Sequence, residues 1–432
     1  MLSCYKYSAM QNNSRQYIQS VSIIGILFFI FGFVTWLNGP LITFVKLAFA
    51  LDTDAKAFWV TTAFYMAYFF TALPSSWILE KTGMKKGMAL GLLVMAIGTF
   101  LFGHFATARD YTNSLIGLFV IGAGLSVLQT ACNPYISIIG PIESAAQRIS
   151  IMGICSKVAG ILSPVILSAF VLKDIDKLES IVANASSPEA KEQILSSFAA
   201  TIYTPYMIMA AVLVALAVWI TQSPLPEVKA SEMNAEISSG TGSRKSIFQF
   251  PHLWLGVFCI FVYVGVEVMA ADAIGTYGKG FNIPGDQTKY FTSFTLGGML
   301  VGYLIGLAAI PKLITQQTAL KFSAILGIVF SLAALLTKGY ISVGCVAALG
   351  LSNALMWPAI FPMAIDGLGK FTEKGSALLI MGIAGGAIIP KIFAEFKTAD
   401  NFQWMFFIIT LPCYLYILYY AVAGHLAGRF KS

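Results

Sequence analysis

Three ionisable residues lie inside long apolar stretches of the sequence, where a charge is costly: Lys157, Glu267 and Asp272. On insertion scales, a charged side chain at the bilayer centre costs roughly 2.5–3.5 kcal/mol, so it normally pairs or faces a wet cavity. One base and two acids leave one excess carboxylate, which a bound cation would neutralise. We therefore expect Glu267 and Asp272 to be cation ligands, with Lys157 beside a carboxylate or a hydroxyl. The alternative is a structural ion cluster.

The spacing of the two acids limits how they can act. Glu267 and Asp272 are five residues apart, about 140° around a regular helix. They can face one cation only if the helix unwinds near Gly265 or Gly275, and otherwise they have separate roles. Histidines occur only near the ends of apolar stretches, which excludes a histidine proton relay.

Uncharged amides and aromatic rings also occupy the apolar stretches. The amides both donate and accept hydrogen bonds, which suits sugar hydroxyls, although such groups also join helices to one another. An indole beside them offers a flat apolar surface for the C–H face of a sugar. The candidate binding residues, with Lys157, are therefore Trp36, Asn38, Gln129, Asn133, Tyr263, Asn353 and Trp357.

A short charged loop carries a further motif. Residues 80–86 read acid, base, any residue, glycine, any residue, base, base, which resembles a conserved loop of the major facilitator superfamily. Glycine permits a sharp reversal of the chain there, and the acid can pair with neighbouring helix ends to latch a gate. The alternative is an ordinary positively charged membrane loop. The gating candidates are Glu80, Lys81, Gly83, Lys85 and Lys86.

The composition describes a membrane protein that must position these residues on helices. Of 432 residues, 57% are apolar and 11% are charged, against about 25% charged in average soluble domains. The apolar runs are too long for barrel strands. Basic residues are scattered, so nucleic-acid binding is not expected. Helices of about 20 residues are predicted over 20–46, 56–79, 85–105, 114–140, 148–172, 199–221, 252–276, 289–311, 318–338, 341–365, 374–394 and 403–424.

These twelve helices fall into two matching sets. A polar stretch with the composition of a linker, 222–250, separates a first bundle, 1–221, from a second, 251–432. The segment Ile-Met-Gly-Ile at 151–154 recurs at 380–383. The sequence thus predicts an all-α membrane protein of two pseudo-symmetric six-helix bundles with a site between them. Lysine and arginine counts in the loops place both termini in the cytoplasm.

Together these features resemble the fucose:proton symporter family of the major facilitator superfamily. The matching segments are 28–33 with 37–38, 129–135, 263–268 and 356–362. Two positions depart from that family: Gly39 and Gln129 stand where fucose permeases carry carboxylates. Residues 154–157 and 267–272 are instead similar to the glucose/galactose branch, in which some members use sodium.

The resemblance implies a transporter that lacks enzyme activity and a bound cofactor. We expect sodium-coupled import of glucose or galactose, with Glu267 and Asp272 as the sodium (metal) ligands, in a bacterial inner membrane, by a monomer. The sugar and the lipid bilayer are the expected partners. The alternatives are proton-coupled sugar symport, in which Glu267 or Asp272 titrates, and export of a drug or metabolite on the same fold.

Overall fold

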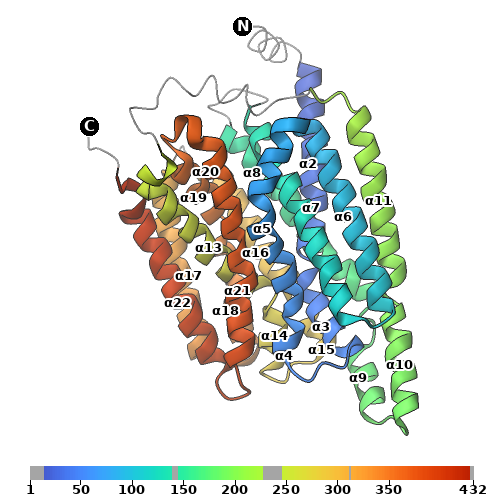
Figure 1. The fold of residues 1–432 in the computed structure, drawn as a ribbon. Coiled ribbons are helices and arrows are strands. Elements are labelled where there is room, and N and C mark those ends of the chain that lie inside the picture. Colours follow the sequence, from blue (N-terminus) through green and yellow to red (C-terminus); the bar gives the residue numbers. More distant parts are fainter. Residues whose placement is uncertain (1–13, 139–144, 227–245, 311–312, 429–432) are drawn as a thin grey trace.

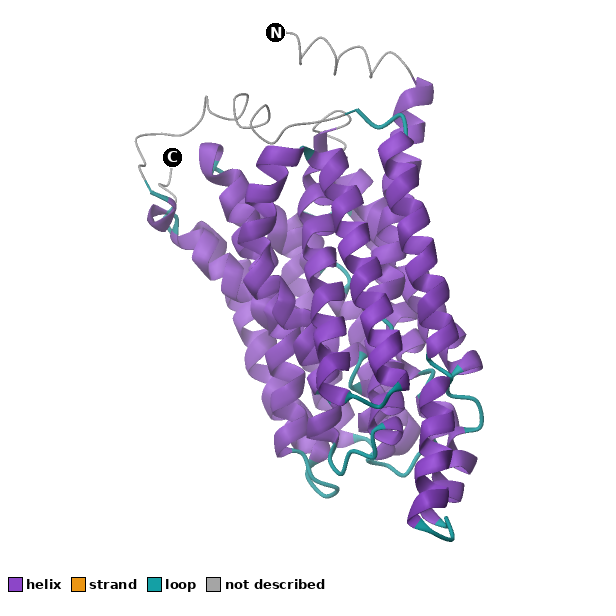
Figure 2. Ribbon diagram, turned by 45° about the vertical axis from the view of Figure 1, so that its right-hand side comes forward, coloured by secondary structure: helices purple, strands orange, loops and turns teal. Residues whose placement is uncertain are grey.

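The computed structural model describes residues 14–138, 145–226, 246–310 and 313–428. Within these ranges every regular element is a helix, as Figure 2 shows. The first part of the chain forms α2 (Ser14–Thr35), α3 (Asn38–Ala48), α4 (Asp54–Ala57), α5 (Trp59–Thr82), α6 (Met84–Thr107), α7 (Tyr111–Ile138), α8 (Ala145–Phe170), α9 (Ile175–Ala183), α10 (Pro188–Ala200) and α11 (Tyr203–Gln222).

The second part of the described chain follows the same plan. It forms η3 (Ile247–Gln249), α13 (Pro251–Ala271), α14 (Ile274–Lys279), α15 (Gly285–Thr288), α16 (Phe291–Ala309), α17 (Gln316–Leu336), α18 (Gly339–Asn353), α19 (Met356–Ile365), η4 (Gly369–Phe371), α20 (Thr372–Met381), η5 (Gly382–Ala384), α21 (Gly385–Phe396), α22 (Phe402–Val422) and η6 (Gly424–Leu426).

The described chain contains eleven helical stretches that are long and apolar enough to cross a membrane. The helix α5 adds a twelfth crossing, because its 24 residues span about 36 Å and it packs along α7, α20 and α21. Its threonine, serine and tyrosine residues make it less apolar than the other crossings. The predicted all-helical, twelve-crossing architecture is therefore confirmed.

Two of the crossings that the sequence predicts as single helices are broken, each about four residues before a proline. The break between α2 and α3 includes Trp36, four residues before Pro40, and the break between α18 and α19 includes Ala354, four residues before Pro358. Proline has no N–H to donate to the carbonyl four residues earlier, and its ring clashes with that carbonyl. Pro134, by contrast, lies within α7 and does not end it.

The helices pack in two groups (Figure 1). Helices α2 to α11 contact mainly one another, as do α13 to α22, while α8 against α16 and α5 against α20 and α21 join the groups. We call these groups the first and second halves. Most of the predicted linker, 227–245, lies outside the described residues. The start of α2 and the helix η6 lie at the same end of the molecule, which we call the terminal face.

The opposite end, which we call the distal face, carries α4, α9 and α15 (Figure 1). Here the halves exchange hydrogen bonds reciprocally. The Asp176 carboxylate accepts the backbone N–H groups of Gly285 (2.7 Å) and Asp286 (3.0 Å), at the start of α15. The Asp286 carboxylate accepts the backbone N–H of Ile175 (3.3 Å), at the start of α9. Each carboxylate thus satisfies donors at a helix start in the other half.

Ion pairs add to these bonds at the distal face. Asp54 lies 2.5 Å from the Lys397 ammonium of the second half, and Lys279 lies 3.1 Å from Glu179. These contacts close the distal end of the interface between the halves. We call them, together with the reciprocal hydrogen bonds, the distal clasp; its members are Asp54, Ile175, Asp176, Glu179, Lys279, Gly285, Asp286 and Lys397.

Candidate functional site

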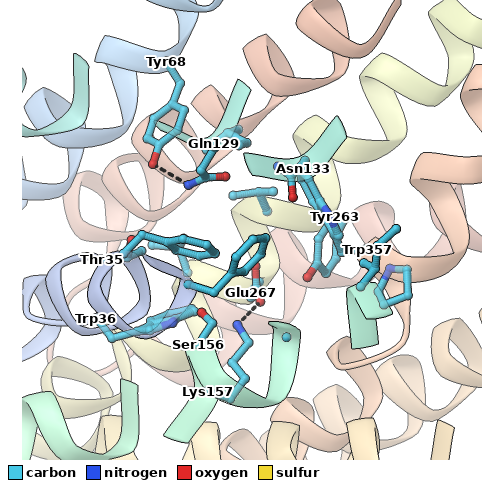
Figure 3. Close-up of a pocket in the computed structure, with 18 of the residues that line it drawn as sticks. Thr35, Trp36, Tyr68, Gln129, Asn133, Ser156, Lys157, Tyr263, Glu267 and Trp357 are labelled. Carbon is cyan, nitrogen blue, oxygen red and sulfur yellow. Dashed lines mark hydrogen bonds and ion pairs between the residues drawn. The ribbon is translucent and has the colours of Figure 1, made fainter. Parts of the chain in front are cut away.

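A pocket lies between the two halves near the middle of the helices (Figure 3). It combines aromatic rings, amides, hydroxyls and one ion pair. Its lining consists of Phe28, Phe31, Thr35, Trp36, Tyr65, Tyr68, Gln129, Asn133, Ile149, Gly153, Ser156, Lys157, Tyr263, Val264, Glu267, Val268, Tyr303, Trp357, Pro358 and Ile383.

An ion pair joins the halves at this pocket. The Lys157 ammonium of α8 lies 3.0 Å from Glu267 Oε1 of α13, and it also lies 4.4 Å from the centre of the Trp36 ring. The side chains of Lys157 and Glu267 are only 9% and 11% exposed. Because the pair is buried, the Lys157 ammonium is stabilised both by the Glu267 carboxylate and by the face of the Trp36 ring.

Close helix packing brings these groups together. A Cβ on Gly32 of α2 would lie 2.2 Å from the backbone oxygen of Ser156, and a Cβ on Gly160 would lie 2.5 Å from Trp36 Cδ1. Only glycine permits contacts this close, so α2 and α8 approach each other closely. This approach places the Trp36 indole, at the α2–α3 break, against Lys157.

The amide of Gln129 lies across the pocket from the ion pair (Figure 3). Its nitrogen donates to the Tyr68 hydroxyl oxygen at 2.8 Å, which fixes the orientation of the amide. Asn133 follows one turn later on α7 and also lines the pocket, as do Trp357 and Tyr263 from the second half. The pocket therefore offers polar groups that donate and accept, next to two indoles.

Asp272 lies outside the pocket lining, on its distal side, where α13 ends. Its residue is 2% exposed, and neither carboxylate oxygen has a hydrogen-bond partner among the described residues. A Cβ on Gly39 would lie 3.3 Å from Asp272 Oδ1. The two candidate acids therefore occupy different environments, because α13 stays helical through Ala271 and points them to different sides.

Two of the expected amides also lie outside the lining. The Asn38 side chain donates to the Thr35 backbone oxygen at 3.1 Å and so bridges the α2–α3 break. Asn353 accepts a hydrogen bond from the Tyr414 hydroxyl at 2.9 Å, between α18 and α22. Neither amide is among the residues that line the pocket, and a sugar-binding role for Asn38 and Asn353 stays a prediction; a sequence cannot show which side of a helix faces the cavity.

The charged loop connects α5 to α6 near the terminal face. Gly83 has a φ of 82°, which explains the glycine, since other residues rarely adopt this conformation. Lys85 donates to the backbone oxygen of Ser223 at 2.7 Å, so the loop is tied to the end of α11 in the same half. A gating role for Glu80, Lys81 and Lys86 stays a prediction.

Sequence reasoning missed the tyrosines of the pocket, Tyr65, Tyr68 and Tyr303. Tyrosine is common in membrane helices and carries no charge that would single it out. One signal was available in the sequence: Gly153 belongs to the segment that recurs between the halves. In the structure this glycine makes room for a tyrosine of the other half, because a Cβ on Gly153 would lie 2.7 Å from Tyr303 Cε1.

Side chains that could bind a metal ion lie apart from one another in the described chain. Among the described residues, no group of three or more histidine, cysteine, aspartate or glutamate side chains is placed to hold a metal ion. Glu267 and Asp272 do not converge on one point, which agrees with the separate roles expected for them if the helix stays regular. A cation-binding role for either carboxyl stays a prediction.

Twelve membrane crossings in two halves around a central pocket define the class of secondary transporters. The comparisons with known proteins agree with this class. The chain belongs to the Major Facilitator Superfamily, which it matches over residues 24–390. It is therefore a multi-pass membrane transporter and not an enzyme.

Several relatives are similar over nearly the whole chain. A glucose/galactose transporter of Brucella abortus biovar 1 (strain 9-941) is 30% identical over 416 residues, which cover 96% of each chain. An L-fucose-proton symporter of Escherichia coli (strain K12) is 28% identical over 383 residues, 88% of this chain and 87% of the relative. The ion named for this relative is the proton, so these names give no support to sodium.

Solved structures show the same fold. The major facilitator transporter FucP, in its outward conformation, has a TM-score of 0.72 at 24% identity, covering 94% of this chain and 99% of that one. A D-xylose-proton symporter has a TM-score of 0.60 at 12% identity, covering 93% and 96%. At these identities the likeness concerns the arrangement of helices.

Proposed function

We propose that this protein imports a hexose of the glucose or galactose type together with a cation, by alternating access. The observation that carries this proposal is the pocket between the halves, in which amides, indoles and a buried ion pair lie within one cavity. Relatives named for glucose, galactose and fucose support a hexose as the substrate.

The pocket supplies the chemistry for a sugar. Hydroxyl groups would exchange hydrogen bonds with the amides of Gln129 and Asn133 and with the Lys157–Glu267 pair. The indoles of Trp36 and Trp357, with Tyr263, would cover the C–H faces of the ring. Asn38 and Asn353 would act indirectly, by bracing the helices around the pocket. An uncharged sugar would fit this pocket without adding a net charge.

Transport would follow from motion of the halves as units, 1–221 and 251–432, joined by 222–250. We place the terminal face in the cytoplasm of a bacterium, because the loops at that face carry more lysine and arginine. The loop with Glu80, Lys81, Gly83, Lys85 and Lys86 would latch that face when the distal clasp opens. Since one chain supplies both sides of the pocket, a monomer would suffice.

The coupling ion that we favour is the proton. Relatives are named as proton symporters, and a single carboxyl is enough to carry a proton. Sodium is the second candidate, because Thr292 Oγ1 and Asp272 Oδ1 lie 2.5 Å and 3.3 Å from where a Cβ on Gly39 would be, and sodium prefers oxygen ligands. Glu267 and Asp272 are the candidate coupling residues in either case.

Uptake of labelled sugars into proteoliposomes tests this function. We expect glucose or galactose to accumulate under an inward pH gradient, and unlabelled hexoses to compete. Gln129→Ala should weaken uptake at low sugar concentration, whereas Gln193→Ala, at an exposed amide of α10, should leave it unchanged. Competition by apolar drugs but by no hexose would support an exporter and refute this proposal. Accumulation driven only by a sodium gradient would identify sodium as the ion.

A further inference from the structure

The strongest unused feature of the molecule is the isolated Asp272 carboxyl. It is buried, it lies outside the pocket, and neither of its oxygens has a hydrogen-bond partner among the described residues. A buried polar group left without partners is rare and calls for a physical reason. A missing ligand is such a reason.

The hydroxyl beside Asp272 has already used its hydrogen. The Thr292 hydroxyl donates to the Ala271 backbone oxygen at 2.7 Å. The remaining lone pairs of Thr292 can face a cation but cannot satisfy a carboxylate. Thr292 Oγ1 would lie 2.5 Å from a Cβ on Gly39, so it belongs to the same small space.

The positive groups near Asp272 do not replace a bound cation. The backbone N–H of Gly39, at the start of α3, acts on the carboxyl but makes no hydrogen bond of normal geometry to it. A helix start carries a partial positive charge that lessens the cost of a nearby anion. The titratable groups close enough to act are Glu267, Lys157 and Tyr65, and Lys157 is already paired with Glu267.

Asp272 also lies on the boundary between the halves. Its carboxyl belongs to the second half, and Gly39, which lies against it, belongs to the first half, on the distal side of the pocket. Closing the distal end therefore buries this carboxyl. Burying an unpaired carboxylate is strongly unfavourable, and neutralising it removes most of that cost.

We infer that Asp272 alone binds the coupling cation, in a site separate from the sugar pocket, and that the distal end closes only when this site is filled. The inference rests on the proposed coupling to a cation and assigns it to one carboxyl. Glu267, held by Lys157, serves the sugar pocket instead. A monovalent cation, either a proton or sodium, supplies the single charge that the site needs.

This arrangement couples ion and sugar without direct contact between them. A carrier with an empty, charged site stays open at the distal face, because closure would bury the charge. A filled site permits closure around the sugar, and release of both on the other side follows. The ion therefore sets which face is open, and the sugar pocket needs no charge change of its own.

A distance measurement in the absence of sugar tests the inference. Spin labels at Lys177→Cys and Lys338→Cys, on the distal side of each half, would report closure in a chain whose six native cysteines are replaced. Raising the pH without sodium should open the wild-type protein, with the closed-to-open ratio falling up to tenfold per pH unit for a single proton. If sodium is the ion, adding sodium at high pH should close it instead.

Variants separate this site from the sugar pocket. Asp272→Asn should stay closed at every pH and sodium concentration, while the double variant Lys157→Met with Glu267→Gln, which removes both pocket charges together, should still open as the pH rises. To guard against misfolding of Asp272→Asn, the carboxyl can be moved: Gly39→Asp with Asp272→Gly and Thr292→Ala should restore the response. A response that survives in Asp272→Asn, or is lost only in the double variant of the pocket pair, would overturn the inference. Failure of sugar uptake would refute the proposed substrate but would not alter these distances.

Discussion

The halves of the molecule exchange charged contacts in two regions that differ in burial. In the pocket, one ion pair between Lys157 and Glu267 is almost fully buried. At the distal clasp the contacts are more exposed, as with Lys279 and Glu179, whose side chains are 32% and 42% exposed. Exposed ion pairs contribute little and are screened by salt, whereas a buried pair is costly to break.

This difference in burial indicates that the distal clasp acts as a gate and that the pocket acts as a binding site. The distal clasp consists of several weak contacts, so it can open and close with little energy. The pocket pair must persist, because either partner alone would leave a buried charge. We therefore expect substitutions in the pocket to affect stability most, and those in the clasp to shift the balance between open and closed states.

The largest effect should come from breaking the pocket pair. Lys157→Ala leaves the Glu267 carboxylate buried without its partner, which should lower the free energy of unfolding by about 3–5 kcal/mol. Thermal unfolding in detergent would measure this loss. The double variant Lys157→Met with Glu267→Gln should recover most of it. Equal losses in the single and double variants would contradict the argument that the pair compensates two buried charges.

A smaller effect should follow from weakening the clasp. Asp176→Asn replaces a carboxylate that accepts two backbone N–H groups of the other half. We expect the closed distal end to lose about 1 kcal/mol, roughly a fivefold shift toward opening. Labelling of Ser168→Cys, which is buried near the distal face, by an impermeant thiol reagent should become faster by that factor.

The matched control for this prediction is Asp174→Asn. Asp174 is exposed two residues earlier in the same segment, and its φ of 52° is one that asparagine tolerates. Its variant should label at the wild-type rate. An equal increase in both variants would mean that the charge of the segment matters rather than the bonds of Asp176.

The smallest effect concerns the pH dependence of the Asp54 contact. Burial raises the pKa of the Asp54 carboxyl, but Lys397 and Lys46 more than offset this and hold the pKa below its ordinary value of 3.8. A lowered pKa means that the contact stabilises the closed end above pH 4 and is lost only as the pH falls through the lowered value.

Labelling of Ser168→Cys in the Asp272→Asn chain would isolate the Asp54 contact, because the proposed cation response is absent there. The labelling rate, divided at each pH by the rate for an exposed cysteine to correct for the thiolate fraction, should stay constant between pH 8 and pH 5, and Asp54→Asn should raise it only about twofold. A steep change in this corrected rate between pH 5 and pH 7 would show that another group of the clasp titrates.

Much of the fold followed from the sequence because membrane crossing is a local property. A run of about 20 apolar residues identifies a helix without knowledge of its neighbours, and the twelve crossings were predicted in this way. The buried charges were also identified, since a charge inside such a run is costly wherever the helix lies. Lys157 and Glu267 were therefore candidates before their pairing was known.

The membership of the pocket was decided by tertiary structure. Asn353 and Tyr68 are both polar residues at mid-crossing, yet Asn353 bonds Tyr414 away from the pocket and Tyr68 lines it. Which side of a helix faces the cavity depends on how closely its neighbours approach, as with the glycines of α2 and α8. The helical period of 3.6 residues shows that each helix has distinct faces, but only packing against neighbouring helices decides which face points into the cavity.

The sequence alone thus determined which helices this protein forms and which residues are costly to bury, because both depend on residue type within one segment. Only the tertiary structure decided that Glu267 is paired while Asp272 is isolated beside Gly39. The reason is that α13 ends at Ala271 and the first half packs against that end. A contact between segments far apart in the chain follows from the packing of both.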